Sequence, residues 1–169
     1  MLYKTSIVAL LGVCLLQSCG SGKTSENSLP AAPVQEASPA PATADVPYTV
    51  AEGYFVKNTV KPGPLPAPRI TTQQDFDNIF GAAAHMGKNG MPTAIDFAKQ
   101  FVIAVVADET DMATELKPIS LKKETGDQLV FTYETIKGAK QSYTIRPVLM
   151  VVVDNTHMGT VVLKDQQAH

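Results

Sequence analysis

The chain has 169 residues, of which 44% are hydrophobic and 18% charged, and its formal net charge is −2. This length suits one globular domain with additional segments, and the near balance of charge, without a basic stripe, argues against nucleic acid as a partner. One of the two cysteines falls in the N-terminal segment that we expect to be removed. The sequence therefore predicts neither a disulfide framework nor a cysteine metal site.

Residues 1–18 are typical of a bacterial lipoprotein signal peptide. Lys4 supplies positive charge, residues 7–16 form a short apolar run, and residues 16–19 read Leu-Gln-Ser-Cys, which resembles a lipobox. An apolar run of about ten residues is too short to cross about 30 Å of hydrocarbon as a permanent helix. We therefore expect cleavage before Cys19 and attachment of lipid, including palmitate, to that residue. These acyl chains would anchor an extracytoplasmic domain to a membrane of the bacterial cell envelope.

Residues 19–47 predict a spacer between the lipid and the domain. After the lipidated Cys19, this segment is rich in Pro, Ala and Ser and poor in large apolar side chains. Such a composition cannot bury enough apolar surface to offset the entropy of ordering, so we expect a disordered tether. The boundary is expected near Tyr48, and residues 48–169 are expected to form a single β-rich globular domain.

Residues 70–81 predict the clearest helix of the domain. Thr71 or Thr72 can cap its first turn, with a polar side chain three positions later to complete a capping box. Apolar side chains three and four positions apart give it one hydrophobic face. Gly81 is expected to end it.

Most of the remaining domain is predicted as strands. Segments 101–107 and 148–153 are apolar on both faces, which indicates central strands. Turns are expected at residues 126–127 and 137–138, and the alternating prolines of 61–68 predict an irregular loop. Further strands are expected at 53–57, 114–123, 129–134, 142–146 and 160–163. With neighbours in sequence pairing, the expected fold class is α+β, a mainly antiparallel β sheet or compact sandwich with one main helix.

Residues 95–105 read Ile-Asp-Phe-Ala-Lys-Gln-Phe-Val-Ile-Ala-Val, a polar turn that runs into an apolar strand. Together with Asp75-Phe76, Pro92 and the terminal strands, this segment resembles the PrcB C-terminal domain family, found in the lipoprotein subunit of a bacterial surface protease complex. The resemblance covers about residues 70–164. It implies a non-enzymatic protein-binding domain whose partner is a protease or its complex. Residues 108–118 lack the glycine turn that the family commonly has after the central strand.

The segment after the first apolar strand, residues 108–118, is predicted as an acidic loop. Loops carried on a rigid sheet are common places for recognition. We predict a partner-contact edge formed by Asp108, Glu109, Asp111, Thr114 and His157. Two alternatives are a merely solvated acidic turn and a Ca²⁺ site. The second is poorly supported, because the segment lacks the twelve-residue ligand spacing of an EF-hand.

The sequence contains no recognised catalytic motif. A Gly-x-Ser-x-Gly elbow, a His-Glu-x-x-His helix and a cysteine nucleophile are missing, and no cofactor or metal is predicted. The leading interpretation is a lipid-anchored envelope protein with a non-enzymatic protein-binding domain. The alternative is a small envelope hydrolase or ligand-binding protein that acts on glycan or peptide through carboxylates such as Asp96 and Asp108. Tyr133 and Tyr143 remain open between a ligand face and strand packing.

Overall fold

The computed structural model describes residues 43–83 and 90–166 of the protein. The expected signal peptide, Cys19 and nearly all of the spacer lie outside the described residues. The described part is mostly β structure, in two four-stranded sheets and one two-stranded sheet, with a single α-helix. The predicted α+β class, a β-rich sandwich with one main helix, is confirmed.

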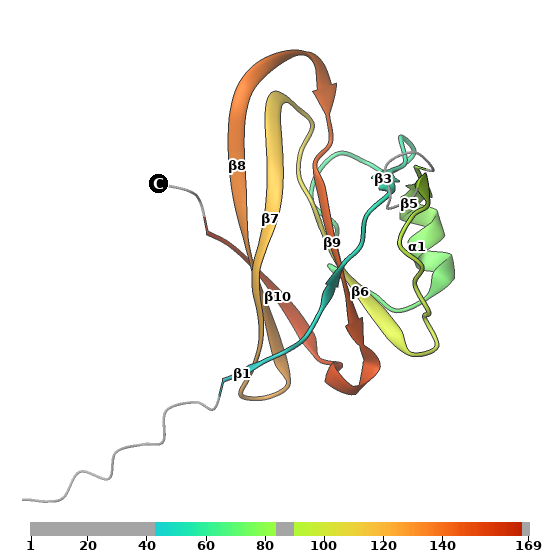
Figure 1. Ribbon diagram of the computed structural model, residues 1–169, viewed down its shortest axis with the longest axis vertical. Coiled ribbons are helices and arrows are strands. Elements are labelled where there is room, and N and C mark those ends of the chain that lie inside the picture. The colour runs from blue at the N-terminus through green and yellow to red at the C-terminus, as the bar shows by residue number, and fades with distance from the viewer. Residues whose placement is uncertain (1–42, 84–89, 167–169) are drawn as a thin grey trace, which may run out of the picture. The chain divides into compact units, whose positions relative to one another are not determined.

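The middle layer is a sheet with the order β2-β9-β6-β4. Its long strands, β6 (Gln100–Val106) and β9 (Val148–Asp154), are the two segments that the sequence predicted as apolar on both faces. They pair antiparallel from Gln100 opposite Asp154 to Val106 opposite Val148. Short strands complete the sheet: β2 (Thr49–Val50) and β4 (Arg69–Ile70). Figure 1 shows β6 and β9 between the other two layers, which explains why both of their faces are apolar.

A second sheet, ordered β1-β7-β8-β10, covers one face of the middle sheet. Side chains from alternate positions of both sheets form a shared core that includes Phe101, Ile103, Val151, Leu129 and Phe131, all fully buried. The strands of this sheet are β1 (Ala44–Asp45), β7 (Thr110–Glu124), β8 (Gln128–Ile145) and β10 (Thr160–Asp165).

The other face of the middle sheet is covered by α1 (Gln73–Ile79) and the hairpin of β3 (Tyr54–Val56) with β5 (Phe80–Ala82). The predicted cap is present at Thr72, whose hydroxyl accepts a hydrogen bond from the Asp75 backbone N–H and donates one to the Asp75 carboxylate. Phe76 fixes the helix on the sheet. Its ring is 2% exposed and contacts the rings of Tyr54, Phe80 and Phe97.

Three local expectations were wrong: the end of the helix, the turn at residues 137–138 and the pairing of the last strand. The helix ends at Ile79 rather than at Gly81, because Gly81 belongs to β5 and pairs with β3. Residues 137–138 form no turn, since β8 continues through them and Lys137 pairs with Thr114. The last strand, β10, pairs parallel to β8 instead of folding back on β9 as a hairpin. β7 and β8, which follow each other in the sequence, therefore pair as expected. β6 and β9 instead pair with each other, although β7 and β8 lie between them in the sequence.

Ordered structure also begins earlier than the expected boundary at Tyr48. Ala44 and Asp45 pair with Lys123 and Lys122 of β7. The next residue, Val46, is 5% exposed and lies in the core between the two larger sheets. The domain therefore includes residues that the composition of the spacer had assigned to the tether.

Candidate functional site

The acidic turn at residues 107–109 lies where β6 leaves the middle sheet and the chain crosses to β7. The predicted loop of residues 108–118 is much shorter than expected, since β7 starts at Thr110 and pairs with the second half of β8. Asp108 and Glu109 are exposed at this crossing. Both residues line a cavity of about 450 Å³, which we call the large hollow to distinguish it from a smaller cavity that shares Glu109.

The walls of the large hollow come from both larger sheets. Val105 and Val106 of β6 and Leu116 of β7 contribute apolar surface. Tyr133 of β8 adds an aromatic wall, with its ring stacked on Phe131 at a centroid distance of 6.3 Å. Burial, and secondarily the nearby charge of Asp165, raises the pKa of the Tyr133 hydroxyl above its ordinary value. The phenol is therefore neutral at physiological pH and keeps its proton for donation.

Asp165 reaches the large hollow from β10, the strand whose pairing the sequence did not predict. It lies opposite Tyr133 in the parallel register of β10 with β8. Its carboxylate accepts a 2.9 Å hydrogen bond from the hydroxyl of Thr135, which also lines the hollow. Thr114 and Lys137, which face each other across β7 and β8, complete the polar part of the wall.

A second cavity of about 310 Å³, the small hollow, adjoins the acidic turn at Glu109. Its lining includes Phe55 of β3, Thr144 of β8 and Arg146, and Glu109 lines both hollows. The Arg146 guanidinium donates hydrogen bonds to the backbone carbonyls of Val60, Lys61 and Gly63, at 2.9, 2.7 and 3.0 Å. It thereby holds the start of the proline-rich loop against this end of the domain.

The structure brings together only some of the predicted partner contacts. Asp108, Glu109 and Thr114 share the large hollow. Asp111 is outside its lining and forms an ion pair with Lys140, with 2.9 Å between carboxylate oxygen and Nζ. His157 is at the opposite end of the middle sheet, in the short 3₁₀ helix η2 (Asn155–His157) that follows β9. The expected proximity of His157 to the acidic turn was wrong, because β6 and β9 run antiparallel.

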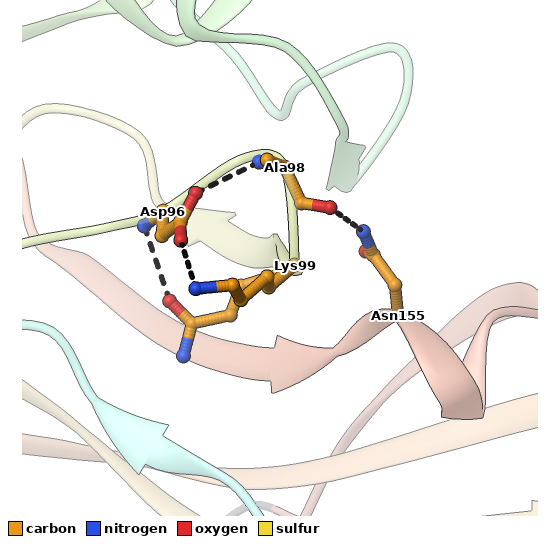
Figure 2. Close-up of polar contacts among 5 residues, drawn as sticks. Asp96, Ala98, Lys99 and Asn155 are labelled. Carbon is orange, nitrogen blue, oxygen red and sulfur yellow. Dashed lines mark hydrogen bonds and ion pairs between the residues drawn. The ribbon is translucent and has the colours of Figure 1, made fainter.

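The carboxylates of the alternative hydrolase hypothesis, Asp96 and Asp108, lie at opposite ends of β6. A strand of this length spans about 20 Å, well beyond the separation of about 5 to 9 Å that paired acid and base carboxylates need. Figure 2 shows what Asp96 does instead: its carboxylate accepts from the Ala98 N–H at 3.1 Å and pairs with Lys99 at 3.2 Å. Asn155 donates to the Ala98 carbonyl in the same view. Asp96 thus shapes the turn into β6.

The described ranges contain no group of three or more His, Cys, Asp or Glu side chains that could hold a metal ion. In the same ranges, no helix is long and apolar enough to cross a membrane.

Sequence reasoning missed Thr135, Lys137 and Asp165 as members of the site. Thr135 and Asp165 lie at the ends of segments with ordinary strand patterning, and Lys137 was expected in a turn, so nothing local marks them as site residues. They join Asp108 only because β10 lies parallel to β8 and the chain crosses between the sheets at residues 107–109. The prolines of 61–68 were a usable signal, since Pro64 also lines the large hollow.

Comparison with known proteins gave no relative. No protein-family model, no curated protein and no solved structure matches the chain.

Proposed function

We propose that the chain is a lipoprotein of the bacterial cell envelope, anchored to a membrane through acyl chains on Cys19, whose extracytoplasmic domain binds a protein partner and catalyses no reaction. The Leu-Gln-Ser-Cys sequence at residues 16–19 supports the anchor. The partner is a bacterial surface protease or its complex, a proposal that rests on the resemblance of residues 70–164 to the PrcB C-terminal domain.

The observation that carries the binding proposal is the arrangement at one end of the domain, where two hollows meet at Glu109. Exposed aromatic side chains lie nearby in sequence and structure: Phe55 in the lining of the small hollow is 47% exposed, and Tyr143, next to Thr144, is 60% exposed. Hollows with exposed aromatics and a polar rim are typical of protein-binding surfaces. A rigid three-layer domain can present them without rearrangement.

Site-directed photo-crosslinking in native envelopes tests this proposal. A photoreactive residue at Thr144, in the wall of the small hollow, should capture one specific envelope protein. The same residue at Thr156, in η2 at the other end of the middle sheet, should not. Equal capture from both positions, or capture of only bulk lipid and abundant porin-like proteins, would contradict a specific partner at this end.

A charge variant gives a second measurement. Replacing Asp108, Glu109 and Asp111 with Asn, Gln and Asn should reduce capture from Thr144 and weaken its dependence on salt, because charges at the rim of an interface mainly set the association rate. The melting temperature should change little, since all three side chains lie at the surface. Unchanged capture by this folded variant would remove the acidic turn from the interface.

A further inference from the structure

The large hollow is unevenly charged. Asp108 and Glu109 line it at the acidic turn, Asp165 lines it from β10, and Lys137 is its only cationic lining residue. In the ranges that the structure describes, neither Asp108 nor Glu109 has an ion-pair or hydrogen-bond partner, and Asp165 accepts only from Thr135. The lining of the large hollow therefore carries a net negative charge, and the Arg146 guanidinium, which shares the small hollow with Glu109, lies outside this lining.

Two lysines of β7 and β8 outside the lining are already engaged. Lys117 pairs with Glu115 at 3.4 Å, and Lys140 pairs with Asp111 at 2.9 Å. Neither of these pairs belongs to the lining of the hollow. The excess of negative charge is thus a property of the large hollow and not of the whole β-hairpin formed by β7 and β8, which we call the β7–β8 ribbon.

The inner wall of the hollow is apolar. Leu116 is 9% exposed and Val105 is 4% exposed, both belong to the core between the two larger sheets, and Tyr133 packs against that core. A flexible side chain with an apolar stem and a cationic head matches this combination, because lysine and arginine bury their methylene groups while the charge stays near polar atoms. An aromatic wall adds attraction for the cation.

We propose that the large hollow binds one lysine or arginine side chain presented by the protein partner. Its methylene stem lies along Leu116 and Tyr133, and its charged head lies among the carboxylates of Asp108, Glu109 and Asp165. This inference rests on the proposed function, because only that proposal makes the bound side chain part of a protein. It adds the chemistry by which the partner is recognised.

Small blocked amino acids test the site directly. The full-length chain, in non-ionic detergent, is titrated with N-acetyl-lysine methylamide and N-acetyl-arginine methylamide while backbone amide NMR shifts are recorded. The neutral controls are the corresponding norleucine and citrulline compounds. The basic compounds should shift the amides of Leu116, Tyr133 and Asp165, and the neutral ones should bind at least about tenfold more weakly, since hydrogen bonds to charged groups are the stronger ones. Equal binding of charged and neutral compounds, or no shift at these amides at the highest concentration, would overturn the proposal.

Variants identify the responsible carboxylates. Asp165→Asn keeps an acceptor for Thr135 but removes the charge, and should weaken binding of the basic compounds about tenfold together with its salt dependence. Glu115→Gln is the matched control, because Glu115 is on the same ribbon but outside the hollow. Equal losses in the two variants would refute a local role for the hollow. Melting curves of both variants show whether the fold is retained.

The two proposals fail separately. Partner capture from Thr144 with no binding of the basic compounds would refute the basic side chain and leave the binding function standing. Binding of the basic compounds without capture of any specific protein would refute the proposed partner and retain the cationic site.

Discussion

Gly159 lies directly against the backbone of Asp127: a Cβ atom built on Gly159 would be 2.2 Å from the Asp127 carbonyl oxygen. The same oxygen accepts a 3.0 Å hydrogen bond from the N–H of Thr160, the first residue of β10. Arg69 of β4 donates to the Gly159 carbonyl from the middle sheet. This contact joins the turn between β7 and β8 to the start of β10, so it sets the parallel pairing that carries Asp165 to the large hollow.

Gly159→Ala should therefore destabilise the domain strongly, by about 3 kcal/mol, because overpacking here meets backbone and not a movable side chain. Unfolding in urea, followed by circular dichroism, measures the loss. The matched control is Gly81→Ala. There the added Cβ would be 2.6 Å from the far end of the half-exposed Phe55 ring, which can turn away, so the expected cost is only about 1 kcal/mol. A larger cost at Gly81 than at Gly159 would be inconsistent with this account.

Hydrophobic patterning predicted the layers of this fold better than their connections. β6 and β9 could be identified because burial on both faces removes every polar position from a strand. The uninterrupted course of β8 could not be predicted, since Lys137-Gly138 has the composition of a turn. In the structure Gly138 lies at a close approach of the two strands, since a Cβ built there would be 3.1 Å from the Ala113 carbonyl oxygen. Glycine suits both a turn and a close contact between two strands. Only the pairing of the strands in the folded domain distinguishes these two roles.

The site shows the same limit. Asp108 and Glu109 stand out in the sequence as acids directly after an apolar strand. Asp165 has no such mark, and it reaches the hollow through a parallel pairing of strands that are far apart along the chain. Parallel neighbours need a crossover connection, and its destination depends on packing rather than on turn residues.

Arg146 gives a test of how the proline-rich loop is held. Arg146→Met keeps much of the apolar stem but removes the donors to three carbonyls, so it should lower the free energy of unfolding by about 2 kcal/mol. Amide hydrogen exchange should increase at Leu65 more than in β6. Lys140→Met, at an exposed ion pair, is the control and should cost less than about 1 kcal/mol. Equal effects of the two substitutions would argue against the clamp.

Val151→Asp tests the core between the two larger sheets. Val151 is fully buried, and an unpaired carboxylate there should cost more than about 4 kcal/mol, enough to unfold much of the protein. Val162→Asp, at a 38% exposed position of β10, should cost less than about 1 kcal/mol. Differential scanning calorimetry compares the two. Similar melting temperatures for both variants would contradict the assignment of the layers.

Cys19→Ser tests the anchor that the sequence predicts. Acylation requires the thiol, so the variant should lose its membrane association while the melting temperature of the domain stays the same. Fractionation with high-salt and carbonate washes measures the association. A variant that still sediments with membranes after both washes would refute lipid attachment at Cys19.

Tyr133 should report the negative charge of the large hollow through its titration. Burial is the larger cause of its raised pKa and Asp165 the smaller, so Asp165→Asn should lower the Tyr133 pKa part of the way toward its ordinary value of about 10. Because the folded-state pKa is raised, the stability from the neutral phenol is complete below about pH 10 and is lost as the pH rises through the folded-state pKa. Tyrosine ring-carbon NMR gives the titration curves.

Tyr54 provides the reciprocal control, since its pKa is raised by burial and then by Asp77: Asp77→Asn should move the Tyr54 curve and leave that of Tyr133 in place. A Tyr133 curve that does not respond to Asp165→Asn would show that the Asp165 charge does not act on the hollow.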